Sequence, residues 1–346
     1  MKNSRFEKNV WSDFVRIETA SQRAPSPRVI TASIALVILV WALNFIAVKI
    51  GLLYLPPFGL ASFRVVLAGA VMVPTYLFCS RLPAFSEAAN ARSRGFSARD
   101  LWTFLYLGFF GVTINQLCFT IGLGFTKVGH SAVIVGMGPI YILVLAVLFR
   151  LERASWRKAT GMIIAFIGIV VLASEHGISA HSASLEGDAI TLMGSIGFAI
   201  YVILAKRVAV KYDTLTMTAF NHFAGAVIVL PLAIYQAARL YGAGNWPLPW
   251  QAWVALGYMA VFSSALAYVF YFWLLRYLEA SQLSAFTYLL PVLATILGIV
   301  FLGEKGSWEQ VVGGVLALGG VYWIESGRES VVKDNIAPGD SVASHR

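Results

Sequence analysis

Arg64 is the residue whose type and position most directly suggest chemistry, because it stands inside a long apolar run. A charge at membrane depth costs at least about 2.5 kcal/mol, so an arginine there is a functional candidate by default. Two interpretations follow: Arg64 binds the carboxylate of a solute through charge-assisted hydrogen bonds, or it holds a cluster of structural carbonyls. Lys49 lies nearer the end of its run and is explained more simply by a side chain that reaches the interface.

Neutral polar side chains at mid-depth form a second group. Amides, hydroxyls and phenols can orient the polar end of a solute against an apolar wall. Any one of them could instead bond a neighbouring helix, which is the usual role of such residues in membranes. As a set, they are predicted to line a solute-binding cavity with Arg64: Asn44, Asn115, Tyr141, Tyr201, Tyr268 and Thr287. Further polar residues at similar depth are Gln116, Ser195, Asn221, His222, Ser263 and Ser264.

Two prolines, Pro139 and Pro291, fall near the middle of apolar runs. Each lacks a backbone donor and leaves the carbonyl four residues earlier, at Val135 and Thr287, without a helical partner. Such a carbonyl is tolerated at membrane depth where it is buried in protein or faces a water-filled cavity. We therefore expect a pair of hinges beside the cavity, the alternative being kinks that serve helix packing.

Several chemistries lack the residues they need. All 17 Asp and Glu residues fall in predicted tails, loops or helix ends, which disfavours exchange of a cation for protons through a buried carboxylate. No Gly-rich loop ends in Gly-Lys-Ser or Gly-Lys-Thr, so ATP hydrolysis is not expected. Cys79 and Cys118 are predicted to be free thiols at opposite faces. No metal site, no cofactor and no enzyme activity are predicted.

The elements that hold these residues must lie in lipid. Hydrophobic residues make up 58% of the 346 positions and charged residues 12%, against about 25% charged in a soluble domain. The net charge of +9 is spread over short connectors instead of forming a patch, so a nucleic-acid partner is not expected. The partners indicated are the lipid bilayer and a small-molecule solute.

Ten apolar segments are long enough, within several residues of error, to cross about 30 Å of hydrocarbon. They are predicted near 30–50, 58–78, 101–120, 131–149, 159–173, 188–205, 216–237, 253–275, 281–301 and 311–324. The fold class expected is an all-α integral membrane protein.

The basic residues predict the orientation of these segments. Twenty-one of the 26 Lys and Arg residues fall on one side and three, namely Lys127, Arg239 and Lys305, on the other. Basic loops resist translocation, so both termini are expected in the cytoplasm and the protein in the inner (plasma) membrane. The first 28 residues do not resemble a secretory signal. They are predicted to be disordered, or alternatively to form an amphipathic surface helix.

The chain contains an internal repeat. A shift of 152 positions superposes Pro139 on Pro291, Glu152 on Glu304 and Trp156 on Trp308, and a shift of 157 aligns the first two segments of each half. Five segments per half is an odd number, so the halves are expected to be inverted relative to one another, as in many secondary transporters. The predicted organisation is a tail (1–29), two five-helix repeats (30–174 and 188–325) and a second tail (326–346).

Small residues and caps predict local packing. Gly161 and Gly168 are seven residues apart and share one helix face, as do Gly313 and Gly320, which favours close helix contact. Ser307 and Gln310 have the spacing of a capping box that opens the last helix, with Glu304 in a structural role beside it.

Several motifs of this sequence resemble those of a known protein family. The first segment reads Trp41-Ala-Leu-Asn-Phe-Ile-Ala-Val-Lys49, the second opens Pro56-Pro-Phe58, and the halves end in Gly138-Pro-Ile140 to Glu152 and Leu290-Pro291 to Gly303-Glu304. Over residues 30–325 the chain resembles the EamA-like branch of the drug/metabolite transporter superfamily. The resemblance implies a ten-helix inverted-repeat carrier with a central cavity that commonly exports amino acids or related metabolites. The two halves differ at two corresponding positions. The first half has Leu151 before Glu152, where the second half has Gly303 before Glu304. The second half has Asn221 at the position that corresponds to Arg64.

The function expected is secondary transport, most simply export, of a neutral or zwitterionic metabolite such as an amino acid. A phosphorylated-sugar or nucleotide-sugar exchanger of the same superfamily is the main alternative, although it would need several basic residues in the cavity. The remaining alternative is a membrane scaffold that moves no solute.

Overall fold

The computed structural model describes residues 25–82, 95–126, 128–153, 155–174, 185–209, 211–244, 246–302 and 307–336. Every regular element in these ranges is a helix, as predicted. Packing divides the chain into Met1–Ala32 and Ser33–Arg346, and the account below concerns the second unit. Of the first unit the structure describes residues 25–32, which include the opening of the first helix. Residues 1–24 of the N-terminal tail, Lys127, Gly303, Glu304 and Lys305 lie outside the described ranges.

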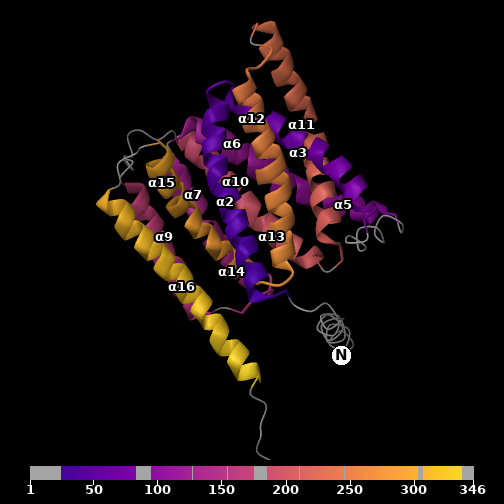
Figure 1. Cartoon of the computed structure of the whole chain (residues 1–346). Coiled ribbons are helices and arrows are strands. Elements are labelled where there is room, and N and C mark those ends of the chain that lie inside the picture. The colour runs from indigo at the N-terminus through magenta and orange to yellow at the C-terminus, as the bar shows by residue number, and fades with distance from the viewer. Residues whose placement is uncertain are drawn as a thin grey trace, which may run out of the picture. The chain divides into compact units, whose positions relative to one another are not determined.

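The helices follow the apolar segments of the sequence. In chain order they are α2 (Pro27–Leu52), α3 (Pro57–Cys79), α5 (Ala98–Leu107), η2 (Gly108–Ile114), α6 (Asn115–Phe125), α7 (Val128–Gly136), α8 (Gly138–Leu148), α9 (Trp156–Ser174), α10 (Leu185–Val208), α11 (Thr214–Gly242), α12 (Trp250–Tyr258), η3 (Met259–Leu266), α13 (Ala267–Leu275), α14 (Ala280–Ala285), η4 (Phe286–Tyr288), α15 (Leu289–Leu302) and α16 (Trp308–Ile336) (Figure 1).

Six helical stretches among the described residues are long and apolar enough to cross a bilayer. They are Pro27–Leu52, Pro57–Cys79, Ala98–Phe125, Leu185–Val208, Thr214–Gly242 and Trp250–Leu275. Two shorter apolar stretches, Val133–Leu148 and Ala280–Leu293, accompany them. The chain is therefore a multi-pass membrane protein, and these stretches coincide with predicted segments.

The last helix is longer than the sequence predicts. Hydropathy ends the final segment at Ile324, whereas α16 continues to Ile336, through part of what was predicted to be the C-terminal tail. Five of the twelve residues from Glu325 to Ile336 are charged, so they end the apolar run, but none of the twelve is a proline that breaks a helix. Pro338 is the first residue that does, because a proline disfavours helical backbone in the residue before it.

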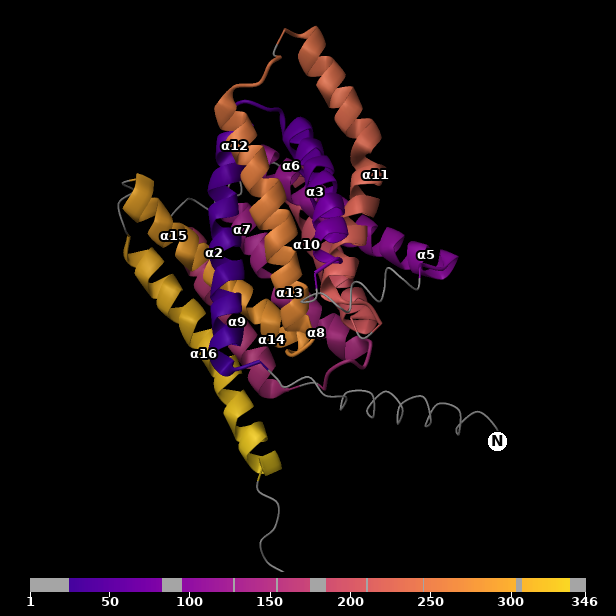
Figure 2. The same cartoon turned by 45° about the vertical axis from the view of Figure 1, so that its right-hand side comes forward.

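Two of the membrane stretches contain π-helix in their middle. The segment η2 joins α5 to α6, and η3 joins α12 to α13, so each stretch runs on without a loop (Figure 2). A π-helical turn locally changes the direction of side chains and often marks a functional site. Here η3 carries Ser263 and Ser264, two consecutive hydroxyls that both reach Arg64.

The stretches that contain Pro139 and Pro291 are interrupted. Helix α7 stops at Gly136, and α8 restarts at Gly138 with Pro139 as its second residue. Similarly, α14 gives way to the 3-10 turn η4 before α15, in which Pro291 is the third residue. The prolines therefore lie in the first turn of a new helix, where a missing donor is harmless, instead of mid-helix as predicted.

Glycines allow α9 and α16 to lie backbone against backbone, and both views show the two helices side by side (Figures 1 and 2). A Cβ atom added at Gly168 would lie 2.6 Å from the Gly313 carbonyl oxygen, and one at Gly320 would lie 2.5 Å from that of Gly161. The predicted close contact is thus confirmed.

The capping box at the start of α16 is confirmed as well, with Gln310 N donating to Ser307 Oγ (3.3 Å) and Ser307 N to Gln310 Oε1 (3.2 Å).

A second close crossing joins α3 to α11. A Cβ atom at Gly69 would lie 2.4 Å from that of Ala226 and 2.9 Å from the carbonyl oxygen of His222. The contact packs α3 closely against α11, and Arg64, five residues earlier on α3, is buried.

The start of α14 is held by Glu152, in the connector after α8. Its carboxylate accepts hydrogen bonds from the Ser281 backbone N–H (3.0 Å), from the Ser281 hydroxyl and from Lys158 Nζ (2.9 Å). Lys158 also pairs with Glu279, directly before α14. These contacts fix the helix whose end, with η4, supplies Ser284 and Thr287 to the cavity described next.

Candidate functional site

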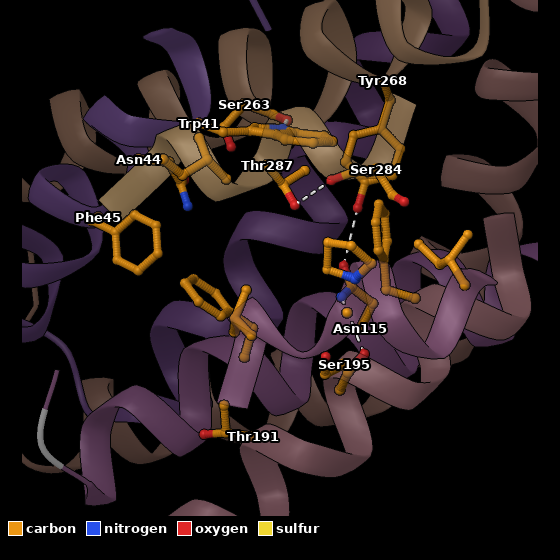
Figure 3. A pocket seen from close by; sticks show the side chains of 18 of the residues that line it. Trp41, Asn44, Phe45, Asn115, Thr191, Ser195, Ser263, Tyr268, Ser284 and Thr287 are labelled. Carbon is orange, nitrogen blue, oxygen red and sulfur yellow. Dashed lines mark hydrogen bonds between the residues drawn. The ribbon is translucent and has the colours of Figure 1, made fainter. Parts of the chain in front are cut away.

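A cavity opens between the interrupted helices and the two π-containing stretches (Figure 3). Its volume is about 120 Å³, several times the roughly 10–15 Å³ that one water needs by this measure. Its wall is Trp41, Asn44, Phe45, Arg64, Asn115, Phe119, Val135, Gly138, Pro139, Ile142, Thr191, Gly194, Ser195, Phe198, Ser263, Tyr268, Ser284, Thr287 and Leu290.

Arg64 supplies the charge of the cavity. Its side chain is 4% exposed, and its nitrogens reach Ser264 Oγ (Nε, 3.3 Å), Ser263 Oγ (Nη2, 3.3 Å) and Thr120 Oγ1 (Nη1, 3.5 Å). These partners are neutral hydroxyls, not carbonyls, and within the described ranges Arg64 forms no ion pair. Hydroxyls satisfy donors without cancelling their charge, so the guanidinium keeps a full positive charge beside the cavity.

Aromatic rings form the apolar part of the wall. Trp41 packs edge-on against Tyr268 (centroids 5.9 Å apart) and Phe198 (6.1 Å), and Phe45 against Phe119 (5.3 Å). Trp41 Nε1 donates to the Ser263 carbonyl oxygen (3.2 Å), which satisfies its polar atom and fixes the ring. A rigid aromatic wall of this kind suits an apolar part of a solute.

The amides of the wall differ in how completely they are bonded. Asn115 donates to the Gly194 carbonyl oxygen (3.2 Å) and accepts from the Tyr268 hydroxyl (3.0 Å). Asn44 Oδ1 is buried and has no donor among the described residues. Its carboxamide is therefore a polar group in the wall with bonding capacity to spare.

Six of the nine residues predicted for the site line this cavity. They are Asn44, Arg64, Asn115, Tyr268, Thr287 and Pro139. Thr287 lies in η4, and its hydroxyl donates to the Ser284 carbonyl oxygen (2.7 Å).

The other three lie outside the lining. Tyr201 is fully buried behind the wall, where its hydroxyl accepts from Asn221 Nδ2 (3.3 Å). The Tyr141 hydroxyl donates to Met137 Sδ (3.3 Å). Pro291 does not reach the cavity, although Leu290 before it does. For these residues the sequence indicated depth but not the direction of the side chain.

Several lining residues were not among those predicted, although helical spacing groups them. Trp41 stands three and four residues before Asn44 and Phe45, on one face of α2. Thr191, Gly194 and Phe198 share one face of α10 with Ser195, which the sequence had already indicated as a polar residue at this depth. Gly194 allows the close approach of α6, since a Cβ there would lie 3.0 Å from that of Cys118. Both cysteines, Cys79 and Cys118, are free thiols.

Apolar membrane helices around a cavity with one cationic and several neutral polar groups are typical of small-solute transporters. The profile of the EamA-like transporter family matches residues 29–174 and 185–326. The chain belongs to this family, which confirms the resemblance and makes the protein a transporter, not an enzyme.

Individual relatives agree with this assignment. An uncharacterized transporter of Archaeoglobus fulgidus is 26% identical over 289 residues, covering 84% of this chain and 96% of that protein. A Streptantibioticus cattleyicolor protein named "Probable terminal-alkyne amino-acid exporter" is 25% identical over 292 residues, covering 84% and 92%. A solved crystal structure, 19% identical, shares the fold with a TM-score of 0.68 over 88% of this chain and 99% of that one.

Proposed function

We propose that the protein is a secondary transporter that exports a small neutral or zwitterionic solute with a carboxylate, such as an amino acid. The observation that carries this proposal is Arg64, a buried guanidinium beside the cavity whose described partners are all neutral. A carboxylate entering the cavity would gain charge-assisted hydrogen bonds from it. The name of the Streptantibioticus cattleyicolor relative, an amino-acid exporter, supports the same class of solute.

The solute contacts we propose are Asn44, Arg64, Asn115, Tyr268 and Thr287. In this arrangement Arg64 binds the carboxylate, Tyr268 and the other rings pack against apolar atoms, and Asn44 bonds a polar group. Tyr141 and Tyr201 are not included, because they do not line the cavity.

A permanent organic cation does not suit this site. Among the described residues the lining contains no Asp or Glu, and a cation would have to leave water for a wall that already carries a positive charge. A zwitterion brings its own counter-charge.

We further propose ten membrane spans arranged as two inverted five-helix repeats, residues 30–174 and 188–325, between two tails. The helix bounds support the repeat: α3 and α11 begin 157 positions apart, and η2 and η3 end 152 positions apart, the same two shifts that align the sequence. The reciprocal glycine contacts of α9 and α16 and the two family matches agree with it. The second match and α10 both begin at Leu185, three residues before the predicted boundary.

Both termini are proposed to lie in the cytoplasm, with the protein in the plasma membrane, on the strength of the basic connectors. A single reactive cysteine at Ser182 should then be labelled from outside intact cells, and one at Ser93 should not. Both positions lie outside the described ranges. The reverse labelling pattern would overturn this orientation.

The mechanism we propose is alternating access, with the two interrupted stretches bending where α7 meets α8 and where α14 meets α15. Pro139 and Pro291 start the second helix of each stretch and keep the break in place. Glu152 holds the start of α14 and would be part of the structure that closes one end of the cavity.

A phosphorylated-sugar or nucleotide-sugar exchanger is the alternative within the same fold. A phosphate carries up to two negative charges and is usually held by several basic side chains. Arg64 is the sole Lys or Arg in the lining as far as the structure describes it, which favours a carboxylate.

Solute export from cells that overproduce the protein tests the proposal, with a metabolite screen followed by uptake into proteoliposomes. We expect acids to be carried better than the matching amides, and Arg64→Ala to abolish the difference. Carriage of quaternary ammonium dyes, equally fast in Arg64→Ala, would contradict the proposed site.

A further inference from the structure

Behind Arg64, a chain of buried polar side chains runs away from the cavity to the backbone of α11. It consists of Ser264, Gln116 and His222, none of which lines the cavity. We infer that Gln116 and His222 are positioning residues, which set the direction of every hydrogen bond in this chain and so aim the Arg64 guanidinium at the carboxylate. This inference rests on the proposed function of Arg64.

The direction is set at the far end, by a backbone carbonyl. His222 Nδ1 lies 2.9 Å from the Thr218 carbonyl oxygen, in the preceding turn of α11. A carbonyl can only accept, so Nδ1 must carry a proton. A neutral imidazole then has its lone pair on Nε2 and accepts there.

The next step orients Gln116. Its Nε2 lies 3.5 Å from His222 Nε2, so the amide NH2 donates to the imidazole. The amide oxygen consequently points the other way, and it accepts from the Ser264 hydroxyl at 3.0 Å.

The last step reaches the guanidinium. A serine hydroxyl has one proton, and Ser264 gives its proton to Gln116. The lone pairs of Ser264 Oγ are therefore left for Arg64 Nε, 3.3 Å away. Reversing Gln116 would place its NH2 against Ser264 Oγ, which would occupy one of the two lone pairs of that oxygen and leave the Ser264 proton without its acceptor.

Burial helps to keep the directions of these hydrogen bonds fixed. His222 and Ser264 are 0% exposed and Gln116 is 2% exposed, so water does not compete for the bonds. The His222 ring is also held by edge-on packing against Tyr268 (centroids 5.1 Å apart), which itself lines the cavity. The chain thus links the aromatic wall, the π-helical segment η3 and α11 to one guanidinium.

The test measures how well the transporter distinguishes an acid from its amide. The probes are L-amino acids and their amides at pH 8.5, where the amide, whose α-amino group has a pKa near 8, is largely uncharged. Uptake into proteoliposomes gives KM and the maximal rate for wild type, Arg64→Gln, Gln116→Leu, His222→Phe and His222→Gln. Melting temperature in detergent reports folding.

Gln116→Leu and His222→Phe should each raise KM for the acids about tenfold, the value of one hydrogen bond to a charged group, and leave KM for the amides unchanged. His222→Gln retains an acceptor for Gln116 and should stay within about threefold of wild type. Thr113→Val is the matched control, since Thr113 Oγ1 is buried on the same stretch without a partner and its loss should leave KM unchanged.

Three results would overturn the inference in different ways. If Arg64→Gln loses the preference for acids while Gln116→Leu and His222→Phe keep it, the positioning roles are wrong and the proposed function stands. If wild type shows no preference for acids, both are wrong. Equal losses in His222→Gln and His222→Phe at unchanged melting temperature would show that an acceptor for Gln116 does not preserve the preference for acids, and would also overturn the inference.

Discussion

Arg64 on α3 and Asn221 on α11 occupy corresponding places, each seven residues after the first residue of its helix. Arg64 lines the cavity and bonds three hydroxyls contributed by other helices. Asn221 is fully buried and donates to Tyr201, which corresponds to Asn44 under the same shift of 157. Asn44 and Arg64 line the cavity, whereas Tyr201 and Asn221 bond to each other behind its wall. Backbone features such as glycine contacts and helix breaks match between the two regions, whereas the buried charge belongs to one of them.

Making the two positions alike should produce the largest effect. Arg64→Asn places the same residue on both helices and removes the charge, so kcat/KM for a carboxylate solute should fall about 10- to 100-fold, as expected for hydrogen bonds to a charged group. Proteoliposome uptake measures it. Moving the charge with Arg64→Asn and Asn221→Arg together should not restore transport, because Asn221 does not line the cavity; restoration would mean that the two positions are interchangeable.

Backbone contacts should respond symmetrically, in contrast to Arg64. Gly161→Val and Gly320→Val each place a side chain against the opposite helix, since a Cβ there would lie 2.9 Å and 2.5 Å from the facing carbonyl oxygens. Each should destabilise the protein by about 1–3 kcal/mol, the usual cost of overpacking. Thermal unfolding in detergent compares the two. A loss confined to one variant would show that α9 and α16 do not meet as reciprocal partners.

Substitution of either proline should have a smaller effect on transport, similar for the two positions. Pro139→Ala and Pro291→Ala permit the neighbouring helix to extend through the break, and each should slow turnover several-fold while insertion is preserved. Transport rate and membrane abundance are measured together, so that slow turnover is separated from poor insertion. Unchanged turnover in the double variant would remove the hinges from the mechanism.

Tyr201 should give the smallest effect of the series. Tyr201→Phe removes one buried hydrogen bond from Asn221, which is typically worth about 1 kcal/mol of stability. KM should not change, because Tyr201 lies behind the wall. An increase in KM of tenfold or more, comparable to the expected loss at Arg64, would return Tyr201 to the site predicted from the sequence.

Hydropathy predicted much of the fold, because lipid imposes one rule on every span. It located α2, α3, α10 and α11, and glycine spacing predicted close packing for α9 and for α16 without indicating that they are partners. It could not predict the π-helical segments η2 and η3, since the change from i→i+4 to i→i+5 bonding leaves no trace in apolar content. The end of α16 was missed for a related reason: its last residues are polar yet still helical.

The site was predictable in part, through residues that are expensive to bury. Arg64 and Asn44 were predicted to belong to the site because burying a polar side chain at membrane depth costs free energy, so such a residue is expected to have a function. Tyr201 and Tyr141 were misplaced because an aromatic residue at mid-depth can point inward, sideways or outward, and helix rotation decides which. Gln116 and His222 were recognised as polar residues at depth, but their order in a chain depends on distances across three helices.

Arg64 has no acidic partner in the part of the chain that the structure describes, and this also has an electrical consequence. Under the proposed mechanism, switching access moves the guanidinium through part of the membrane field, which is worth about 2.3 kcal/mol per charge per 100 mV. A bound zwitterion leaves the net charge unchanged, so the loaded and empty steps carry equal and opposite charge and the cycle is electrically silent. A bound anion neutralises Arg64 on one step only, and its transport would generate a current.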